Sequence, residues 1–263
     1  MIIWALFDSG NGCYTQAVGK YFPQAEIFPI GVDIENKNSH FINLNLADYS
    51  EIFNGKSPIF DKLDTLPKPD IILASPPCES WSLWTSLKGG TNFWQMTQEI
   101  NTLFGEVKVP TAFTLQTREN FDKALENRHG FFKAHWHKTL YKRVNGELCA
   151  YNTLRIIERY NPKIWVIENP QTSKIWEYFQ QIHDFVGIKN IAHYNYYDEN
   201  FPKKPTCFLS NIDLNLKITL DKAKASLKGL EGRPSPSTYN ERSDIPLELI
   251  KKILNKAQKE ISK

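Results

Sequence analysis

Four short apolar runs, each followed by polar residues or glycine, constrain the fold of this chain more than any other feature of its sequence. The runs span residues 2–7, 28–34, 70–74 and 163–167. Helical patterns follow the first run, over Tyr14 to Tyr21, and precede the fourth, over Tyr151 to Tyr160. Continuous apolar runs that alternate with helices are typical of a parallel sheet with helices on both faces. The sequence therefore predicts the α/β fold class with a mostly parallel sheet.

The polar residues after these runs are expected to meet at one edge of the sheet. In open parallel sheets, ligands bind outside the carboxyl ends of the strands. Gly10, Asp33, Cys78 and Glu168 each stand at or just after such an end. We therefore expect them to line a common site, although they are far apart in the sequence.

Composition places the chain among ordinary globular proteins and excludes disordered and collagen-like structure. Of its 263 residues, 41% are hydrophobic, and 32 Lys and Arg nearly balance 29 Asp and Glu. A net charge of +3 is too small to indicate a partner. Any contact with nucleic acid must therefore come from local clusters of basic residues.

The four cysteines are far apart in the sequence and form no C-x-x-C pair. This spacing argues against a structural zinc site or a disulfide framework, so we expect reduced thiols in a cytoplasmic protein. The apolar run at residues 2–7 lacks a basic flank and is too short for a signal sequence or a membrane span. No later run is long enough to span a bilayer, and we expect no contact with a membrane.

The loop Asp8-Ser9-Gly10-Asn11-Gly12 stands between the first strand and a helix. Glycines in such a loop let a ligand approach the backbone, and Asp33 after the next strand can accept hydrogen bonds from a ribose. The loop lacks the patterns G-x-G-x-x-G and G-K-S/T of phosphate-binding loops, which favours an adenosyl ligand without a pyrophosphate. Asp48 has two interpretations, a contact to the adenine amino group or a helix cap.

The segment Ser75-Pro76-Pro77-Cys78 holds the most informative cysteine of the chain. Two prolines fix the backbone after the strand at 70–74 and present Cys78 at its tip, an arrangement that suits a nucleophile. The alternative is a small buried thiol that follows Pro-Pro without a chemical role.

Glu168-Asn169-Pro170 follows the strand at 163–167 and places a carboxyl group at a strand tip. If it is buried, this glutamate has a raised pKa and can donate a proton to a ring nitrogen. The alternative is a glutamate that caps a turn or pairs with a cation.

The 90 positions between Cys78 and Glu168 exceed what one strand and one helix need, so this region carries an insertion at about 85–150. Its middle, 127–143, mixes basic and aromatic residues and is predicted to contact DNA phosphates. Two histidines in this stretch, His135 and His137, have no matching third ligand, and we predict no metal site. The basic residues predicted to bind DNA are Arg128, Lys133, Lys138, Lys142 and Arg143.

Two domains are expected along the chain. Residues 1–216 form the catalytic domain, and 217–263 form a C-terminal helical extension with an amphipathic helix over 247–261. The segment from Glu79 to Trp94 contains Gly89-Gly90 and suits a loop that closes over a substrate, or else a plain surface loop.

Several of these motifs, in this order, resemble the DNA cytosine-5 methyltransferase family, and in particular its small phage and prokaryotic members. The resemblance is dense only in short patches between about residues 3 and 250. These patches are Leu6-Phe7 with Ser9-Gly10-Asn11-Gly12, Pro77-Cys78-Glu79-Ser80-Trp81-Ser82, Glu168-Asn169-Pro170, Lys204-Pro205-Thr206 with Ser210-Asn211, and Arg242-Ser243-Asp244-Ile245-Pro246.

The resemblance implies a Rossmann-like fold, S-adenosylmethionine as cofactor and double-stranded DNA as partner. It implies that Cys78 attacks C6 of a flipped cytosine while Glu168 hydrogen-bonds N3 and the exocyclic amine. The methyl group then passes to C5 of the base. A monomer is implied, with a cognate restriction endonuclease as a candidate partner in restriction-modification. The implied cofactor contacts are Phe7, Asp8, Ser9, Gly10, Gly12, Asp33, Asp48 and Pro76, and further DNA contacts are Ser80, Ser82 and Lys204.

This chain also departs from the family pattern at several positions. Glu79 stands where the family usually has Gln, Pro170 stands where it usually has Val, and no Q-x-R-x-R segment is present. The arginine of that segment normally assists at the base, and the candidates to replace it here are Arg155, Arg159, Lys203 and Lys204. Two alternative functions follow, a methyltransferase that acts on exocyclic amines through a motif like Ser75-Pro76-Pro77, and a catalytically silent DNA-binding relative.

Overall fold

The computed structural model describes residues 1–32, 40–81, 94–115, 117–126, 135–225 and 243–263. Its described residues form two compact units. Unit 1 contains residues 1–76, 151–171 and 187–263, and unit 2 contains residues 77–150 and 172–186. The division falls within one long helix, α5 (Trp136–Tyr160).

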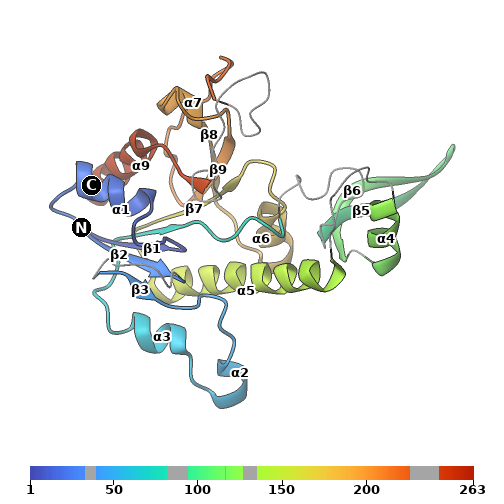
Figure 1. Ribbon diagram of the computed structural model, residues 1–263, viewed down its shortest axis with the longest axis horizontal. Coiled ribbons are helices and arrows are strands. Elements are labelled where there is room, and N and C mark those ends of the chain that lie inside the picture. Colours follow the sequence, from blue (N-terminus) through green and yellow to red (C-terminus); the bar gives the residue numbers. More distant parts are fainter. Residues whose placement is uncertain (33–39, 82–93, 116, 127–134, 226–242) are drawn as a thin grey trace. The chain divides into compact units, whose positions relative to one another are not determined.

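Unit 1 is built on a seven-stranded mixed sheet (Figure 1). The strand order is β3-β2-β1-β4-β7-β9-β8, and β9 is antiparallel to both of its neighbours while the other pairings are parallel. This arrangement confirms the α/β class and the mostly parallel sheet. The strands are β1 (Ile2–Leu6), β2 (Glu26–Gly31), β3 (Ile42–Asn43), β4 (Ile71–Ala74), β7 (Ile164–Pro170), β8 (Ile188–His193) and β9 (Pro205–Ser210).

Both faces of this sheet are covered, because successive side chains of a strand point to opposite faces. Ile3 and Ala5 of β1 belong to a core that includes residues of α1 (Cys13–Tyr21) and α9 (Leu247–Ile261). Trp4 of β1 packs its ring against Tyr160 at the end of α5, at 4.6 Å between centroids. Phe60 of α3 (Pro58–Leu63) lies on the same side, near Tyr160. The near-continuous apolar character of the central strands follows from this double coverage.

The predicted elements of unit 1 match the structure closely. The strand predicted at 70–74 is β4, and the helix predicted at 247–261 is α9 with the same bounds. The strand predicted at 163–167 continues to Pro170, because β9 pairs with it beyond the point where β4 ends. The helix predicted at 151–160 is the last part of α5, which begins at Trp136. Two short helices, α2 (Glu51–Asn54) and α7 (Tyr194–Tyr197), complete this unit.

Unit 2 contains the residues that follow Pro76 and holds a separate two-stranded sheet. Trp81 is fully buried, and its ring lies 4.6 Å from that of Tyr178 in α6. The backbone N–H of Lys174, just before α6, donates to the carbonyl of Trp81. The elements of this unit are β5 (Trp94–Thr102), β6 (Gly105–Leu115), α4 (Arg118–Glu126), the first part of α5, and α6 (Ile175–His183).

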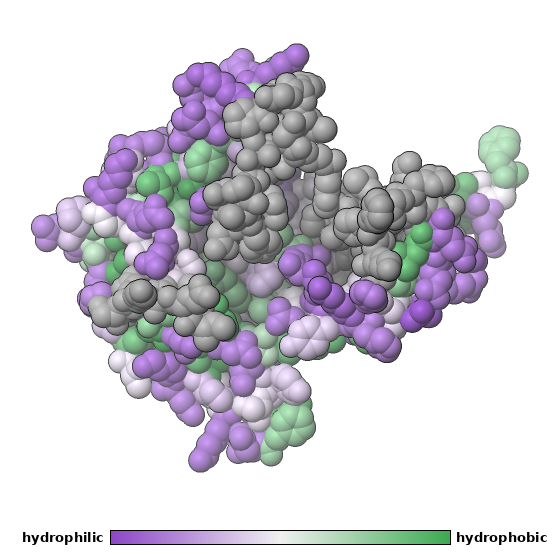
Figure 2. All heavy atoms as spheres, viewed as in Figure 1, coloured by the Kyte–Doolittle hydropathy of each residue, from purple (hydrophilic) through white to green (hydrophobic). Residues whose placement is uncertain are grey.

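The end of the β5–β6 hairpin carries two large apolar side chains in solvent (Figure 2). Leu103 and Phe104 connect the two strands and are almost completely exposed. The side chain of Thr102 donates to the carbonyl of Gly105, whose φ of 108° closes the turn.

None of the helices that the structure describes is long and apolar enough to cross a membrane.

Candidate functional site

The carboxyl ends of β1, β4 and β7 lie at one edge of the sheet in unit 1, because these strands are parallel. Phe7 and Asp8 follow β1, and Ser75 and Pro76 follow β4. In β7, the last residue that pairs with β4 is Ile167, and Glu168 comes directly after it. The end of β8 and the start of the reversed strand β9 reach the same edge. The topology thus brings the predicted cofactor residues of unit 1 and Glu168 to one edge.

The loop after β1 contains two residues with a left-handed backbone conformation. Phe7 and Gly10 have φ values of 63° and 75°, in the left-handed region, which costs a residue with a side chain more than it costs glycine. The N–H of Phe7 donates to the carbonyl of Ile30 in β2 at 2.7 Å and holds the start of the turn. The strain at Phe7 therefore lies at the expected ligand-binding turn, where such backbone conformations are commonly found.

Asp8 is the centre of this turn. It is 6% exposed, and its carboxylate accepts hydrogen bonds from the backbone N–H of Ser9 at 2.8 Å and from the hydroxyl of Thr15 at 3.0 Å. Burial raises the pKa of Asp8 above its usual value, and these hydrogen bonds oppose the rise. A Cβ on Gly12 would overlap the carboxylate, and a Cβ on Gly31 would lie 2.6 Å from the Asp8 carbonyl oxygen. Glycine at both positions is what lets Asp8 fit there.

The amino end of α1 lies next to this turn and faces the Asp8 carboxylate. Gly12 is the N-cap, and no acidic residue lies in the first turn of the helix. The Asp8 carboxylate accepts hydrogen bonds from the hydroxyl and from the backbone N–H of Thr15, which lies in that turn. A negative charge is favoured at such a helix end, and here Asp8 supplies it.

Asp48 forms a local turn just before α2. Its Oδ1 accepts hydrogen bonds from the backbone N–H of Ser50 at 3.0 Å and from the Ser50 hydroxyl at 2.7 Å. The N-cap of α2 is Ser50 itself, so Asp48 does not cap this helix. The carbonyl of Asp48 accepts a hydrogen bond from the side-chain amide of Asn152, which also donates to the carbonyl of Leu46. The predicted contact to adenine stays a prediction.

Glu168 is buried in a polar network. It is 8% exposed, and the hydroxyl of Tyr194, at the end of β8, donates to its Oε1 at 3.4 Å. Ser75 also hydrogen-bonds the carboxyl group, and the Ser75 hydroxyl is 2.8 Å from that of Tyr14. Burial raises the pKa of Glu168 above its usual value, while the charge of Lys204 opposes the rise. The group is therefore easier to protonate than an exposed glutamate, as the sequence predicts for a buried acid.

Asn169 joins the ends of β7 and β4. Its side-chain N–H donates to the carbonyl of Pro76 at 2.8 Å. Its Oδ1 is buried and has no hydrogen-bond partner among the residues that the structure describes. A buried acceptor without a partner costs free energy, so this oxygen is available to a polar ligand.

Cys78 lies in unit 2 with the segment that follows it. Its thiol is half-buried and is not in a disulfide, and its carbonyl accepts the backbone N–H of Trp81 at 3.1 Å, which forms a turn. Ser80 is 5% exposed, and its hydroxyl has no hydrogen-bond partner among the described residues. It packs so closely against Gly146 of α5 that a Cβ there would overlap it.

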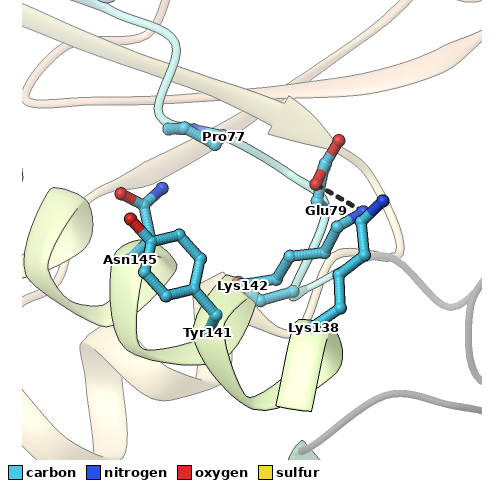
Figure 3. Close-up of a pocket in the computed structure, with 7 residues that line it drawn as sticks. Pro77, Glu79, Lys138, Tyr141, Lys142 and Asn145 are labelled. Carbon is cyan, nitrogen blue, oxygen red and sulfur yellow. Dashed lines mark ion pairs between the residues drawn. The ribbon is translucent and has the colours of Figure 1, made fainter. Parts of the chain in front are cut away.

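A hollow of about 320 Å³ in unit 2 brings together several predicted DNA-binding residues (Figure 3). One face of α5 supplies four polar side chains, and the segment after Pro76 forms the other wall. Within the hollow, Lys142 and Glu79 form an ion pair at 2.7 Å. The lining residues are Pro77, Glu79, Ser80, Lys138, Tyr141, Lys142 and Asn145.

The remaining predicted residues lie elsewhere. Arg143 does not line this hollow and pairs with Glu147, one turn along α5, at 3.3 Å. Lys204 belongs to unit 1, where its ammonium lies 5.0 Å from the centre of the Tyr194 ring. Four predicted residues lie outside the described residues, namely Asp33, Ser82, Arg128 and Lys133.

Three residues at the Glu168 network were not predicted from the sequence, namely Tyr14, Ser75 and Tyr194. Ser75 ends the run that precedes Pro76 and was readable as a strand-tip residue. Tyr194 directly follows β8, so recognition of that strand would have placed it at the same edge. Tyr14 lies on the buried side of α1, and nothing in its sequence context distinguishes it from a core aromatic.

Comparisons with known proteins add no assignment to this geometry. No protein-family model matches the chain, and no curated protein matches it significantly. Among the described residues, no three His, Cys, Asp or Glu side chains are grouped closely enough to hold a metal ion.

Proposed function

We propose that this chain is an S-adenosylmethionine-dependent DNA methyltransferase that transfers a methyl group to C5 of cytosine. The observation that carries the proposal is the buried, hydrogen-bonded Glu168 at the same sheet edge as the strand tip that leads through Pro76 and Pro77 to Cys78. A carboxyl group that is easily protonated and a cysteine at a strand tip are the two groups that this chemistry needs.

The topology of unit 1 supports the proposal. The parallel part of the sheet begins in the doubly wound order 3-2-1-4, as in dinucleotide-binding folds. It differs from them by the reversed strand β9, which lies between β7 and β8 in the sheet. Ligands of such sheets bind outside the carboxyl ends of the strands, where Asp8 and Glu168 lie.

The residues at this edge fit a cofactor that carries an adenosyl group and an amino acid. The turn at Gly10 and Gly12 leaves the backbone open to close approach by a ligand. Asp8 can accept hydrogen bonds or face a positive charge. The proposed contacts in unit 1 are Phe7, Asp8, Ser9, Gly10, Gly12, Asp48 and Pro76. When bound, S-adenosylmethionine supplies an electrophilic methyl group.

The sequence links Cys78 to the end of β4. The carbonyl of Pro76, which follows β4, accepts a hydrogen bond from the side chain of Asn169, and Asn169 directly follows Glu168. Cys78 comes two positions after Pro76 in the sequence.

In the proposed reaction, the Cys78 thiolate forms a bond to C6 of a cytosine that has left the duplex. Protonated Glu168 donates to N3 of the base, so the ring can accept the electron pair that the new S–C6 bond pushes into it. C5 becomes nucleophilic and takes the methyl group. Loss of the C5 proton to a base then re-forms the C5–C6 double bond and releases Cys78 as thiolate, while N3 returns its proton to Glu168. Atoms and electrons balance over the cycle.

The proposal is tested by methyl transfer to duplex DNA with a labelled methyl group on the cofactor, followed by identification of the methylated nucleoside. The account expects 5-methylcytosine for the wild type and none for Cys78→Ala. Cys149→Ala is the matched control, because it also removes a thiol that is not in a disulfide, at a buried position of α5. Label in an N-methylated base, or label that persists in Cys78→Ala, would contradict the proposed chemistry.

A further inference from the structure

The hollow in unit 2 presents a row of donor groups on one side of a helix. Lys138, Tyr141, Lys142 and Asn145 are spaced by three or four residues, so their side chains share one face of α5 (Figure 3). Each of the four carries at least one hydrogen-bond donor, and the two lysines add positive charge. A hollow of about 320 Å³ with this lining has the size and the polarity to hold a small anionic group.

Among the described residues that line this hollow, Glu79 on the wall opposite α5 is the only one with a carboxylate, and it forms an ion pair with Lys142 at 2.7 Å. The side chains of Glu79 and Lys142 are 42% and 40% exposed. An ion pair in contact with water contributes little, so a stronger anion can take the place of Glu79 on Lys142. The described lining contains two lysines and one glutamate, so these residues together carry a positive charge.

We infer that this hollow binds one phosphate group of the DNA backbone, and that Glu79 competes with that phosphate for Lys142. The inference rests on the proposed function, because it takes DNA as the partner. A phosphodiester matches the donor set, since its oxygens accept hydrogen bonds from lysine, hydroxyl and amide donors at once. Cys78 directly precedes Glu79, so a phosphate held here anchors the strand beside the nucleophile. Glutamate at position 79 thereby lowers the affinity for DNA.

The competition is tested by the affinity of the full chain for duplex DNA, measured by fluorescence anisotropy over a series of salt concentrations. Glu79→Gln frees Lys142 and is expected to tighten binding about threefold to tenfold. It also adds one phosphate contact, which steepens the slope of log K against log salt by about 0.9. Glu158→Gln is the matched control, because it removes an exposed carboxylate elsewhere on the same helix, and it is expected to have neither effect.

A second set of variants identifies the lysine that responds. Lys142→Gln is expected to weaken binding more in the Glu79→Gln background than in the wild type, because in that background no carboxylate at position 79 competes with the phosphate for Lys142. Lys252→Gln, on the exposed side of α9, controls for the loss of a positive charge. Unchanged circular dichroism and thermal midpoints verify that all variants are folded, which the exposure of the substituted side chains leads us to expect.

The outcomes separate this inference from the proposed function. If the wild type methylates DNA but Glu79→Gln binds it no better than Glu158→Gln, the inference is wrong and the function stands. If Glu79→Gln shows the predicted change in the slope of log K against log salt but the wild type transfers no methyl group, the phosphate site is supported and the proposed chemistry is wrong. Inorganic phosphate is the probe for the other source of the same ligand chemistry. If Glu79→Gln bound inorganic phosphate more tightly than the wild type but bound DNA no more tightly, the assignment of the hollow to a phosphate of the DNA backbone would be contradicted.

Discussion

The glycine turn at Asp8 yields the sharpest prediction about how this sequence builds its site. Gly12→Ala would place a methyl group where the Asp8 carboxylate lies, so that carboxylate would have to move. The backbone at Gly12, with φ of −73° and ψ of 177°, suits alanine as well as glycine. The expected defect is therefore steric and concerns the Asp8 side chain.

The magnitude follows from the two hydrogen bonds that hold the carboxylate, from Ser9 and Thr15. Their loss costs about 1–3 kcal/mol at about 0.5–1.5 kcal/mol each. The poorer N-cap that alanine provides adds up to about 1 kcal/mol. Gly12→Ala is thus expected to lower the free energy of unfolding by about 1–4 kcal/mol. A turn displaced in this way is also expected to weaken cofactor binding by at least about tenfold, equal to 1.4 kcal/mol.

Gly19→Ala is the matched control in the same helix. A Cβ at Gly19 meets no atom within 4 Å, and the position lies inside α1. This variant is expected to gain about 0.5–1 kcal/mol, because glycine in a helix costs that much relative to alanine. Urea denaturation measures both stabilities, and calorimetry with S-adenosylmethionine measures binding. Equal stabilities and affinities for Gly12→Ala and the wild type would refute the packing of Gly12 on Asp8.

Three further results are expected. Glu168→Gln should be more stable than the wild type at neutral pH and equally stable below about pH 4. Burial raises the pKa of Glu168 from its usual 4.5, so ionisation of this carboxyl group opposes folding. Thermal melts at a series of pH values test this, and a difference in stability that does not vary with pH would contradict it. Ile253→Ala in the buried face of α9 should cost about 2–5 kcal/mol in denaturant titrations, whereas Lys252→Ala on its exposed face should change stability by less than about 0.5 kcal/mol. Replacement of Leu103 and Phe104 by serine should leave the thermal midpoint unchanged, because both side chains are solvated in the folded state.

The strands of unit 1 were predictable where both faces of the sheet are buried. Strands with apolar residues on both faces, such as β1 and β4, are readable as continuous apolar runs. The helix α9 was predictable to its ends, because its apolar face repeats with helical spacing and Pro246 precedes it. The extension of β7 was not predictable, since it depends on pairing with β9, which is far along the chain.

Unit 2 shows where sequence patterns fail. The first part of α5 carries polar and basic residues around much of its surface, so it shows no apolar stripe by which a helix could be recognised. The hairpin of β5 and β6 is likewise joined by Leu103-Phe104, which lacks the usual turn residues of two-residue loops. Both elements depend on contacts that neighbouring residues in the sequence do not encode.

The candidate site was predictable in part for a related reason. Residues at strand tips, such as Asp8 and Glu168, follow from the rule that parallel strands end at one edge. The network around Glu168 also uses Tyr14 from a helix and Tyr194 from the end of β8. Such partners depend on how side chains meet in space, and a single sequence does not show this.

The central claim is that Cys78 attacks the cytosine ring, and covalent trapping tests it most directly. Duplex DNA with C5-fluorinated cytosine is incubated with the protein and S-adenosylmethionine, and the cross-linked peptide is identified by mass spectrometry. Because fluorine at C5 cannot leave as a proton does, the account predicts a stable adduct on Cys78, absent in Cys78→Ala and retained in Cys149→Ala. An intact protein without any adduct, under conditions where it methylates unmodified DNA, would contradict the claim.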